Sequence, residues 1–532
     1  MKKMKRFFTG MSAMLLAATL LLSACDSDNG NGNGGGGAEP AGASGFRDVI
    51  RVGIDVDVNM LDPRLSTGTG NQRVIEAVFD GLIELDANLV AQPVLATHWE
   101  NPDPLTWIFH LREGVYFSNG QPFGARDVAH TIESMVCPEF NSPGRSHFIA
   151  IEEVVIIDDH TVQFNLSSPF APLLSNLERG IVPYNADEMD DFPMNPIGTG
   201  PYMVTEVLRN NRVTVVANPN YWGEAPVTPT IVYYIIPDNT VRIAALEAGD
   251  IDLVHSPLSP MDIARLRGDA RFEVIEMNAI GLTFLNFNQR EEFVTGELAV
   301  RRAIAHMIDR DTIANNIYMG MDLPAHHGGL IVGTWSFCES VQAFPFDPPT
   351  GQQFLIDAGF EQADNGFFYR DGERLVIQLT THSEDPNRIM AIEFIQQTLN
   401  NNGIEAHVTT FEWATFFSQV QAGNYEIALL GLVNIVDPDR YFYLRFRTGA
   451  ANNEGQFSHP DLDEAVIAAR QESDQAVRAE LYQLAAQIVN DYVGHHVLLN
   501  QGYIVIYNTN LTGFVPKSSG SWRSIARVAV AE

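Results

Sequence analysis

The segment 412–438 constrains the fold most strongly, because it combines a helix, a turn and a buried strand. Its sequence predicts a helix that begins at Trp413 and a turn at Gly423, and then a nearly uncharged strand over residues 426–433. A strand buried on both faces is apolar in this way, and ligands of open α/β sheets collect beyond the carboxyl ends of the strands. We therefore expect residues 431–437 to form the floor of a ligand cleft. A core strand followed by a surface loop is the alternative.

A second loop of interest follows an earlier strand. Residues 51–58 alternate in the manner of a strand, and residues 72–79 resemble a helix. Between them lie Thr67, Gly68 and Thr69, whose backbone N–H groups would be able to contact a ligand. A plain turn is the alternative interpretation of this loop.

The remainder of the chain, 532 residues in all, predicts several domains of two kinds. Short alternating runs separated by turns, with one helix near residues 125–135, predict an antiparallel, hairpin-rich module over about 83–182. Longer helices and strands, typical of an α/β body, are expected elsewhere. They lie at residues 202–208, 212–217, 231–236, 240–248, 281–288, 297–313, 388–401, 405–410, 461–470, 476–491 and 496–507.

The N-terminus carries the pattern of a secretory signal. Lysines and an arginine precede a mostly apolar run over residues 7–22, which ends in Leu-Ser-Ala-Cys at Cys25. This ending resembles the bacterial lipobox, in which the cysteine receives a lipid such as palmitate and becomes the first residue of the mature protein. A transmembrane anchor is the alternative, although the run is shorter than the ~20 residues needed to span a bilayer. We expect a signal peptide at 1–24, a flexible lipid-anchored tether at 25–45, and an extracytoplasmic location at the membrane.

The composition argues against a nucleic-acid partner, and two cysteines and two histidines are the other residues of interest. Acidic residues outnumber basic ones 66 to 33, and a formal net charge of -33 would repel nucleic acid. Cys137 and Cys338 are separated too widely in sequence to predict whether they pair. His326 and His327 would suit a transition metal, but no further ligand stands at metal-binding spacing, so no metal site is assigned. We expect no cofactor.

Several motifs, in order along the chain, resemble those of one family, the extracytoplasmic solute-binding lipoproteins of ABC importers for peptides and nickel (family 5 type). The motifs are MLDP from residue 60, HLREGVYFSNGQPFGARDVAHTI from 110, IGTGPYMV from 197, NPNYWG from 218, ALEAGDIDLV from 245, LAVRRAIAHMIDRDTI from 298 and EWATFF from 412. The resemblance implies an α/β, type II periplasmic-binding-protein fold, with two α/β lobes joined by a hinge and an inserted hairpin-rich third lobe.

The resemblance also implies boundaries for these lobes. Lobe I would comprise residues 46–82, 195–285 and 495–532, lobe II residues 83–194, and lobe III residues 286–494. The hinge would lie near 283–286 and 494–497. A solute bound between lobes I and III would stabilise the closed form, which a membrane permease then recognises.

In peptide-binding relatives the backbone around the position of Gly431 holds the ligand as an added strand, and Trp413 matches a tryptophan of the cleft. A core tryptophan is the alternative for Trp413. The chain departs from the family where Leu432 replaces a second tryptophan and where Asn434 or Ile435 replaces the aspartate that meets a peptide amine. An unpaired ammonium is costly to bury, so an ordinary free-amine peptide is disfavoured unless Asp437 substitutes.

The arginines of some oligopeptide-binding relatives are also replaced, by Val420 and Leu429. Three hypotheses follow. The first is a monomeric receptor for a peptide or peptide-like solute. The second is the same scaffold binding a non-peptide solute such as an oligosaccharide, an opine or a nickel chelate. The third, a secreted hydrolase, lacks a Gly-x-Ser-x-Gly or His-Glu-x-x-His motif, so we expect no enzyme.

Overall fold

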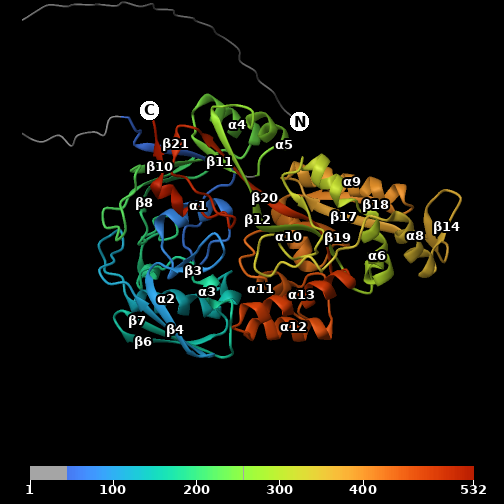
Figure 1. Ribbon diagram of the computed structural model, residues 1–532, viewed down its shortest axis with the longest axis horizontal. Helices are drawn as coiled ribbons and strands as arrows, with labels where there is room; N and C mark the ends of the chain where they lie inside the picture. The colour runs from blue at the N-terminus through green and yellow to red at the C-terminus, as the bar shows by residue number, and fades with distance from the viewer. Residues whose placement is uncertain (1–44, 256) are drawn as a thin grey trace, which may run out of the picture. The chain divides into compact units, whose positions relative to one another are not determined.

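A computed structural model describes residues 45–255 and 257–532 (Figure 1). The predicted signal peptide and residues 25–44 of the predicted tether, Cys25 included, lie outside these residues. Within the described ranges, none of the helices combines the length and apolar character needed to cross a bilayer.

A mixed sheet of eleven strands organises the fold. Its order is β18 (Glu405–Phe411), β17 (Val376–His382), β19 (Ile427–Leu432), β12 (Phe272–Phe287), β20 (His495–Asn508), β11 (Leu253–His255), β1 (Val49–Ile54), β10 (Thr230–Ile235), β9 (Arg212–Ala217) and β8 (Tyr202–Leu208), with β13 (Leu323–Pro324) beside β20. The pairs β1–β10, β1–β11, β17–β18 and β17–β19 are parallel. Parallel strands covered by helices confirm the predicted α/β class.

The two longest strands, β12 and β20, lie side by side in the middle of this sheet (Figure 1). Their antiparallel ladder runs from the Phe272–Asn508 pair to the Asn286–His495 pair. The register shifts between Asn278 and Leu282 and again after Thr283. Such irregularities locally disrupt a ladder and bend the strands. The β12–β20 pair therefore connects the two halves of the sheet, and its ladder is irregular near the middle.

On the β1 side of this pair, helices and loops enclose two cores. The helices are α1 (Thr69–Val78), α4 (Asn239–Ala248) and α5 (Pro260–Leu266). Helix α4 shows how the local sequence sets an element, because Asp238 accepts a hydrogen bond from Val241 N at its start and Gly249 adopts a left-handed conformation at its end. Trp522, near the C-terminus of the chain, is fully buried in the core that also includes β1 and β10.

The segment between α1 and β8 forms the predicted antiparallel module. Four strands pair in the order β4 (Ala96–Asp103), β5 (Thr106–Leu111), β7 (Thr161–Leu166) and β6 (Ile151–Asp158). The remaining strands and α-helices of the segment are β2 (Ile83–Leu85), β3 (Ala91–Pro93), α2 (Ala125–Val136) and α3 (Leu173–Asn176). The module has its own core, in which Phe109 and Phe164 of neighbouring strands lie 5.1 Å apart between ring centroids.

On the β19 side, helices cover both faces of the sheet because successive strand residues point to opposite sides. Leu285 and Leu429 share a core with α6 (Leu298–Met307), α8 (Pro348–Asp357) and α9 (Pro386–Asn401). Phe284 and Leu430 share the other core with α10 (Trp413–Ala422), α11 (Asp439–Phe446), α12 (Pro460–Gln471) and α13 (Gln475–Asp491). Short strands β14 (Glu361–Gln362), β15 (Phe368–Arg370) and β16 (Glu373–Arg374) form a small outer sheet, and β21 (Leu511–Thr512) pairs with β22 (Ala529–Val530).

The helix expected over residues 297–313 is wrong as a single element. It ends at Met307, and Asp309 adopts an extended backbone conformation. The Asp309 carboxylate accepts a hydrogen bond from Thr312 N and starts a new short helix, α7 (Arg310–Thr312), which continues as a π-helical turn over Ile313–Ile317. An aspartate inside an apolar helical pattern thus acts as a helix start instead of a surface residue.

Candidate functional site

A cavity of about 290 Å³ lies against the irregular stretch of β12 and β20. Thr283 of β12 and Gln501, Gly502 and Tyr503 of β20 contribute to its floor. One wall comes from the N-terminus of α1, the β11–α5 connection and residues 518–520. The opposite wall comes from residues 318–322, the start of α9 and the residues that follow β19. Elements from both sides of the β12–β20 pair therefore converge on one space.

Arg388 presents a cation in the second of these walls. It lies in the first turn of α9, which Asp385 caps by accepting hydrogen bonds from the N–H groups of Asn387 and Arg388. The same aspartate pairs with Arg388 Nε at 3.3 Å. Arg388 Nη1 also lies 3.0 Å from Nε2 of His382. The guanidinium is thus held in place before any ligand arrives, which lowers the entropy lost on binding.

A chain of contacts joins Arg388 to Trp413. Glu384 Oε2 lies 3.0 Å from His382 Nδ1, and its other oxygen accepts the backbone N–H of Trp413 at 2.8 Å. The Trp413 ring packs edge-on against the His382 ring at 5.1 Å. Burial and the neighbouring Arg388 charge hold the pKa of His382 below its usual value. A neutral imidazole that donates from Nδ1 to Glu384 and accepts at Nε2 from Arg388 satisfies all of these contacts.

Arg73 presents a second cation, in the wall formed by α1. Its guanidinium donates to the carbonyl of Gly520 and lies 3.8 Å from Glu76. It also stacks over the Trp522 ring, with 4.9 Å to the ring centroid. The start of α1 lies in the same wall and adds the partial positive charge of a helix N-terminus. Each wall of the cavity therefore presents one guanidinium.

Carboxylates of the cavity lie near these cations. Asp322 accepts the backbone N–H of Gly502 at 2.9 Å, and burial raises its pKa to about 7. Asp385 and Arg388 lie close enough to influence that pKa in opposite directions. A cationic group of a ligand beside Asp322 would favour its ionised form. The cavity thus offers sites for both an anionic and a cationic group of one solute.

The structure brings only some of the predicted site residues to this cavity. Thr69 and Asn434 line it, and Asn434 has a left-handed backbone conformation with φ 55°. Gly431 lies beneath Arg388 and Gln501, where any side chain would overlap both. Thr67 and Gly68 precede α1 outside the lining residues, and Leu432 packs at the edge of a core.

Trp413 and Asp437 also lie away from the cavity lining. Trp413 begins α10, is 44% exposed, and reaches the cavity only through His382 and Glu384. Asp437 is buried, and Arg478 pairs with its carboxylate at 2.8 Å. That carboxylate also accepts the N–H of Asp439. With these partners Asp437 is engaged in holding the loop, so it does not take the place of the missing aspartate.

Sequence reasoning missed Arg73, Asp322 and Arg388. A signal for Arg388 exists, because it follows the carboxyl end of β17, a strand parallel to β19, and the rule that located residues 431–437 applies equally to β17. No local pattern marks Arg73 or Asp322, since they come from distant segments that meet only when β12 pairs with β20. The histidine pair at 326 and 327 separates: His326 lies 3.2 Å from Asp311, whereas His327 faces the carbonyl of Val341. Cys137 and Cys338 are free.

Comparisons with known proteins converge on one family. Residues 90–454 match the model of the bacterial extracellular solute-binding proteins, family 5. The chain is 28% identical to the dipeptide-binding protein of Escherichia coli over 75% of this chain and 79% of that protein. It is 30% identical to protein XP55 of Streptomyces lividans, over 83% and 81%. The crystal structure of NikZ from Campylobacter jejuni in complex with Ni(L-His) superposes with a TM-score of 0.82 at 25% identity, covering 91% of this chain and 99% of that one.

Proposed function

The chain belongs to the bacterial extracellular solute-binding proteins of family 5, and from this premise we propose that it captures a short peptide or peptide-like solute in the cavity between Arg73 and Arg388. The observation that carries the proposal is the presence of a fixed guanidinium in each wall together with the carboxylate of Asp322. These groups suit the carboxylate and the ammonium of a zwitterion. They supply the charges that residues 431–436 lack.

The size of the cavity restricts the solute. Its volume of about 290 Å³ stands at the lower end of the roughly 300–1,000 Å³ that small-molecule sites occupy. A dipeptide or tripeptide is therefore favoured over a long peptide. The E. coli relative is named a dipeptide-binding protein, which agrees with a ligand of this size.

A non-peptide solute is the second candidate. It is favoured by Asn434, which places a neutral amide in the cavity lining and, with Ile435, is one of the two residues that the family resemblance sets against the aspartate of peptide-binding relatives. The similar protein from C. jejuni was solved with Ni(L-His), a chelate that combines carboxylate and amine groups. An opine, a nickel chelate or an oligosaccharide therefore belongs in the same binding experiment as the peptides.

We assign lobe I to residues 46–82, 195–285 and 495–532, lobe II to 83–194 and lobe III to 286–494. Support comes from the register shifts of β12 and β20, which lie beside the cavity and close to the crossovers at 283–286 and 494–497. A solute that contacts Arg73 in lobe I and Arg388 in lobe III would stabilise the closed form, because only that form satisfies both contacts. A membrane permease would then accept the closed complex.

The N-terminal pattern supports a location at the outer side of the membrane. We propose that residues 1–24 are removed, that Cys25 carries the lipid, and that residues 25–45 tether a monomeric receptor near its permease. Mass spectrometry of the mature N-terminus in a membrane fraction tests this directly. A mature chain that begins elsewhere, or a Cys25 without a lipid, contradicts the anchor.

Isothermal titration calorimetry of the purified chain tests the ligand. The panel contains dipeptides to pentapeptides, their N-acetylated and C-amidated forms, an opine, Ni(L-His) and an oligosaccharide. We expect dipeptides or tripeptides to bind best, amidation or acetylation to weaken binding by about tenfold or more, and the solute to be recovered intact. Arg388→Ala should abolish the effect of amidation, whereas the exposed control Arg374→Ala should preserve it. Preferred binding of a neutral oligosaccharide would overturn the proposal.

A further inference from the structure

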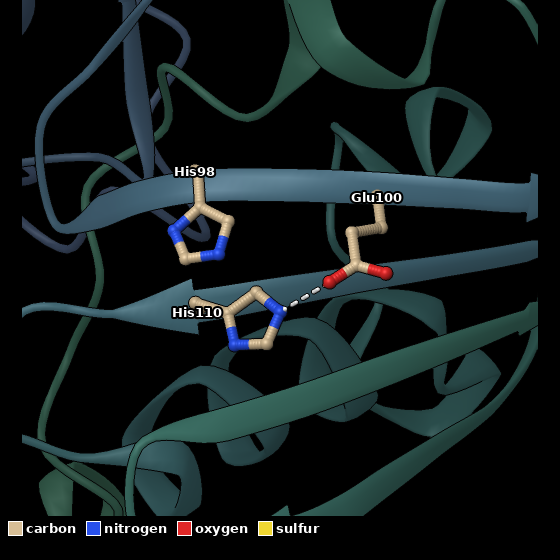
Figure 2. Close-up of side chains that lie close together, drawn as sticks. All are labelled: His98, Glu100 and His110. Carbon is tan, nitrogen blue, oxygen red and sulfur yellow. Dashed lines mark hydrogen bonds and ion pairs between the residues drawn. The ribbon is translucent and has the colours of Figure 1, made fainter.

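Three potential metal ligands meet on the outer face of the module formed by β4, β5, β7 and β6. His98 and Glu100 are two residues apart on β4 and therefore point to the same side of the sheet. His110 of β5 pairs directly with His98 in the antiparallel ladder. Figure 2 shows both imidazole rings and the Glu100 carboxylate on one side of the two strands. Within residues 45–255 and 257–532, this is the one group of three such side chains whose ligand atoms all lie within 4.8 Å of one another.

The two imidazole rings are stacked face to face. Their centroids are 4.1 Å apart and their planes differ by 7°. His110 Nε2 lies 2.9 Å from Glu100 Oε1 and donates its proton to this oxygen, so the two atoms face each other. Two nitrogens bound to one tetrahedral zinc ion at ~2.0–2.1 Å lie about 3.4 Å apart. The three ligand atoms already lie within 4.8 Å of one another, so side-chain rotations that unstack the rings would turn all three toward one ion, which would displace the proton on His110 Nε2.

A hydrogen bond selects the tautomer of His98. The Thr97 hydroxyl donates its single proton to the carbonyl of His110 at 3.1 Å. His98 Nδ1 lies 3.1 Å from the same hydroxyl oxygen and therefore donates to it. Protonation at Nδ1 leaves the lone pair on Nε2, the nitrogen that Figure 2 shows turned toward His110 and Glu100. Metal-bound histidines are commonly oriented by such a contact at their other nitrogen.

We propose that His98, Glu100 and His110 bind one divalent late transition-metal ion, with Zn²⁺ as its representative. Imidazole and carboxylate ligands suit this class of ion, and three protein ligands leave a fourth position for water. His98 and Glu100 are exposed, so the ion has access from solvent. The site belongs to the hairpin-rich module and does not depend on the solute cavity or on the proposed function.

Calorimetric titration of ZnCl₂ into the EDTA-treated and dialysed full mature chain tests the site. We expect one zinc ion per chain, and His98→Ala and His110→Ala should each weaken its binding by about tenfold or more. Glu100→Gln should weaken it as well, by a smaller factor. Zinc should also raise the thermal unfolding midpoint of the unsubstituted chain and lose this effect in both histidine variants.

His407 provides a matched control. It lies on β18 and is exposed, and its Nε2 is 3.0 Å from Glu405 Oε1. This contact resembles the one between His110 and Glu100, but it belongs to no group of three potential metal ligands among the described residues. His407→Gln should leave the zinc titration unchanged. Zinc binding that survives both His98→Ala and His110→Ala, or that falls equally in His407→Gln, would overturn the assignment. Each variant must retain its unfolding transition in EDTA, and if His110→Ala does not, His110→Gln replaces it.

Discussion

The Arg388 guanidinium occupies the space above Gly431, where a Cβ would overlap its Nη2. Gln501 limits the same space from β20, and its Nε2 donates to the carbonyl of Leu282 at 3.0 Å. A residue without a side chain at the end of β19 therefore lets an arginine from α9 reach the cavity. The glycine contributes to the site by leaving room, independently of any backbone contact with ligand.

Replacement of Gly431 tests this relationship. Gly431→Ala should displace Arg388 and Gln501 and weaken binding of the preferred solute by about tenfold, or ~1.4 kcal/mol. Calorimetry gives the affinity, and thermal unfolding shows whether the fold is kept. Gly268→Ala is the control, because the nearest atom to its added Cβ is Arg265 O at an ordinary 3.7 Å. An unchanged affinity in Gly431→Ala would show that Arg388 does not need this position.

Trp413 is expected to act on the site through His382. Trp413→Ala should lower solute affinity several-fold because the ring that packs against His382 is removed. The free energy of unfolding should change by less than ~1 kcal/mol, since the side chain is 44% exposed. Calorimetry and urea unfolding measure the two effects. Phe417→Ala, which removes the ring stacked on Trp413 at 5.7 Å, is the control and should affect binding less.

Some elements of this fold are determined by their own residues, whereas others depend on contacts between distant segments. Helix α10 and strand β19 follow the prediction because their signals are local: Glu412 accepts the N–H groups of Ala414 and Thr415, and Gly423 adopts a left-handed conformation. The buried strand then requires only an apolar run. Elements that depend on their own few residues are therefore predictable from the sequence.

The binding cavity is less predictable, because its charged residues come from distant segments. Arg73, Asp322 and Arg388 meet only after β12 and β20 bring both sides of the sheet together. Asp437 illustrates the same limit, since the arginine that pairs with it lies 41 residues later in the chain. A carboxylate in a loop has the same appearance in sequence whether it meets a ligand or an internal arginine.

Glu426 should make stability depend on pH. It is 7% exposed, it accepts the N–H of Gln378, and burial raises its pKa to about 7 from the usual 4.5. The native state therefore holds this proton more tightly than the unfolded state, and the free energy of unfolding falls as pH rises from about 4.5 through 7. Glu426→Gln keeps an acceptor for Gln378 and removes the charge. It should be more stable than the unsubstituted chain at pH 8 by on the order of 1–3 kcal/mol.

Urea unfolding at pH 5 and pH 8 measures this difference, which should shrink at the lower pH. The exposed Glu373, changed to Gln, is the control and should show a small effect at both pH values. An advantage of Glu426→Gln that is the same at both pH values would contradict a titrating carboxylate as its cause.

A carboxylate at position 434 should change the preferred solute. Asn434 lines the cavity with φ 55°, a conformation that aspartate also tolerates, and its carbonyl accepts Arg440 Nη1 at 2.9 Å. Asn434→Asp should therefore keep the loop and strengthen binding of free-amine peptides about threefold or more relative to their N-acetylated forms. Calorimetry with dipeptides to pentapeptides measures the ratio. Asn387→Asp adds the same charge elsewhere in the lining and serves as the control. An equal gain in both variants would indicate general attraction between charges, and no gain in Asn434→Asp would place the peptide amine away from this loop.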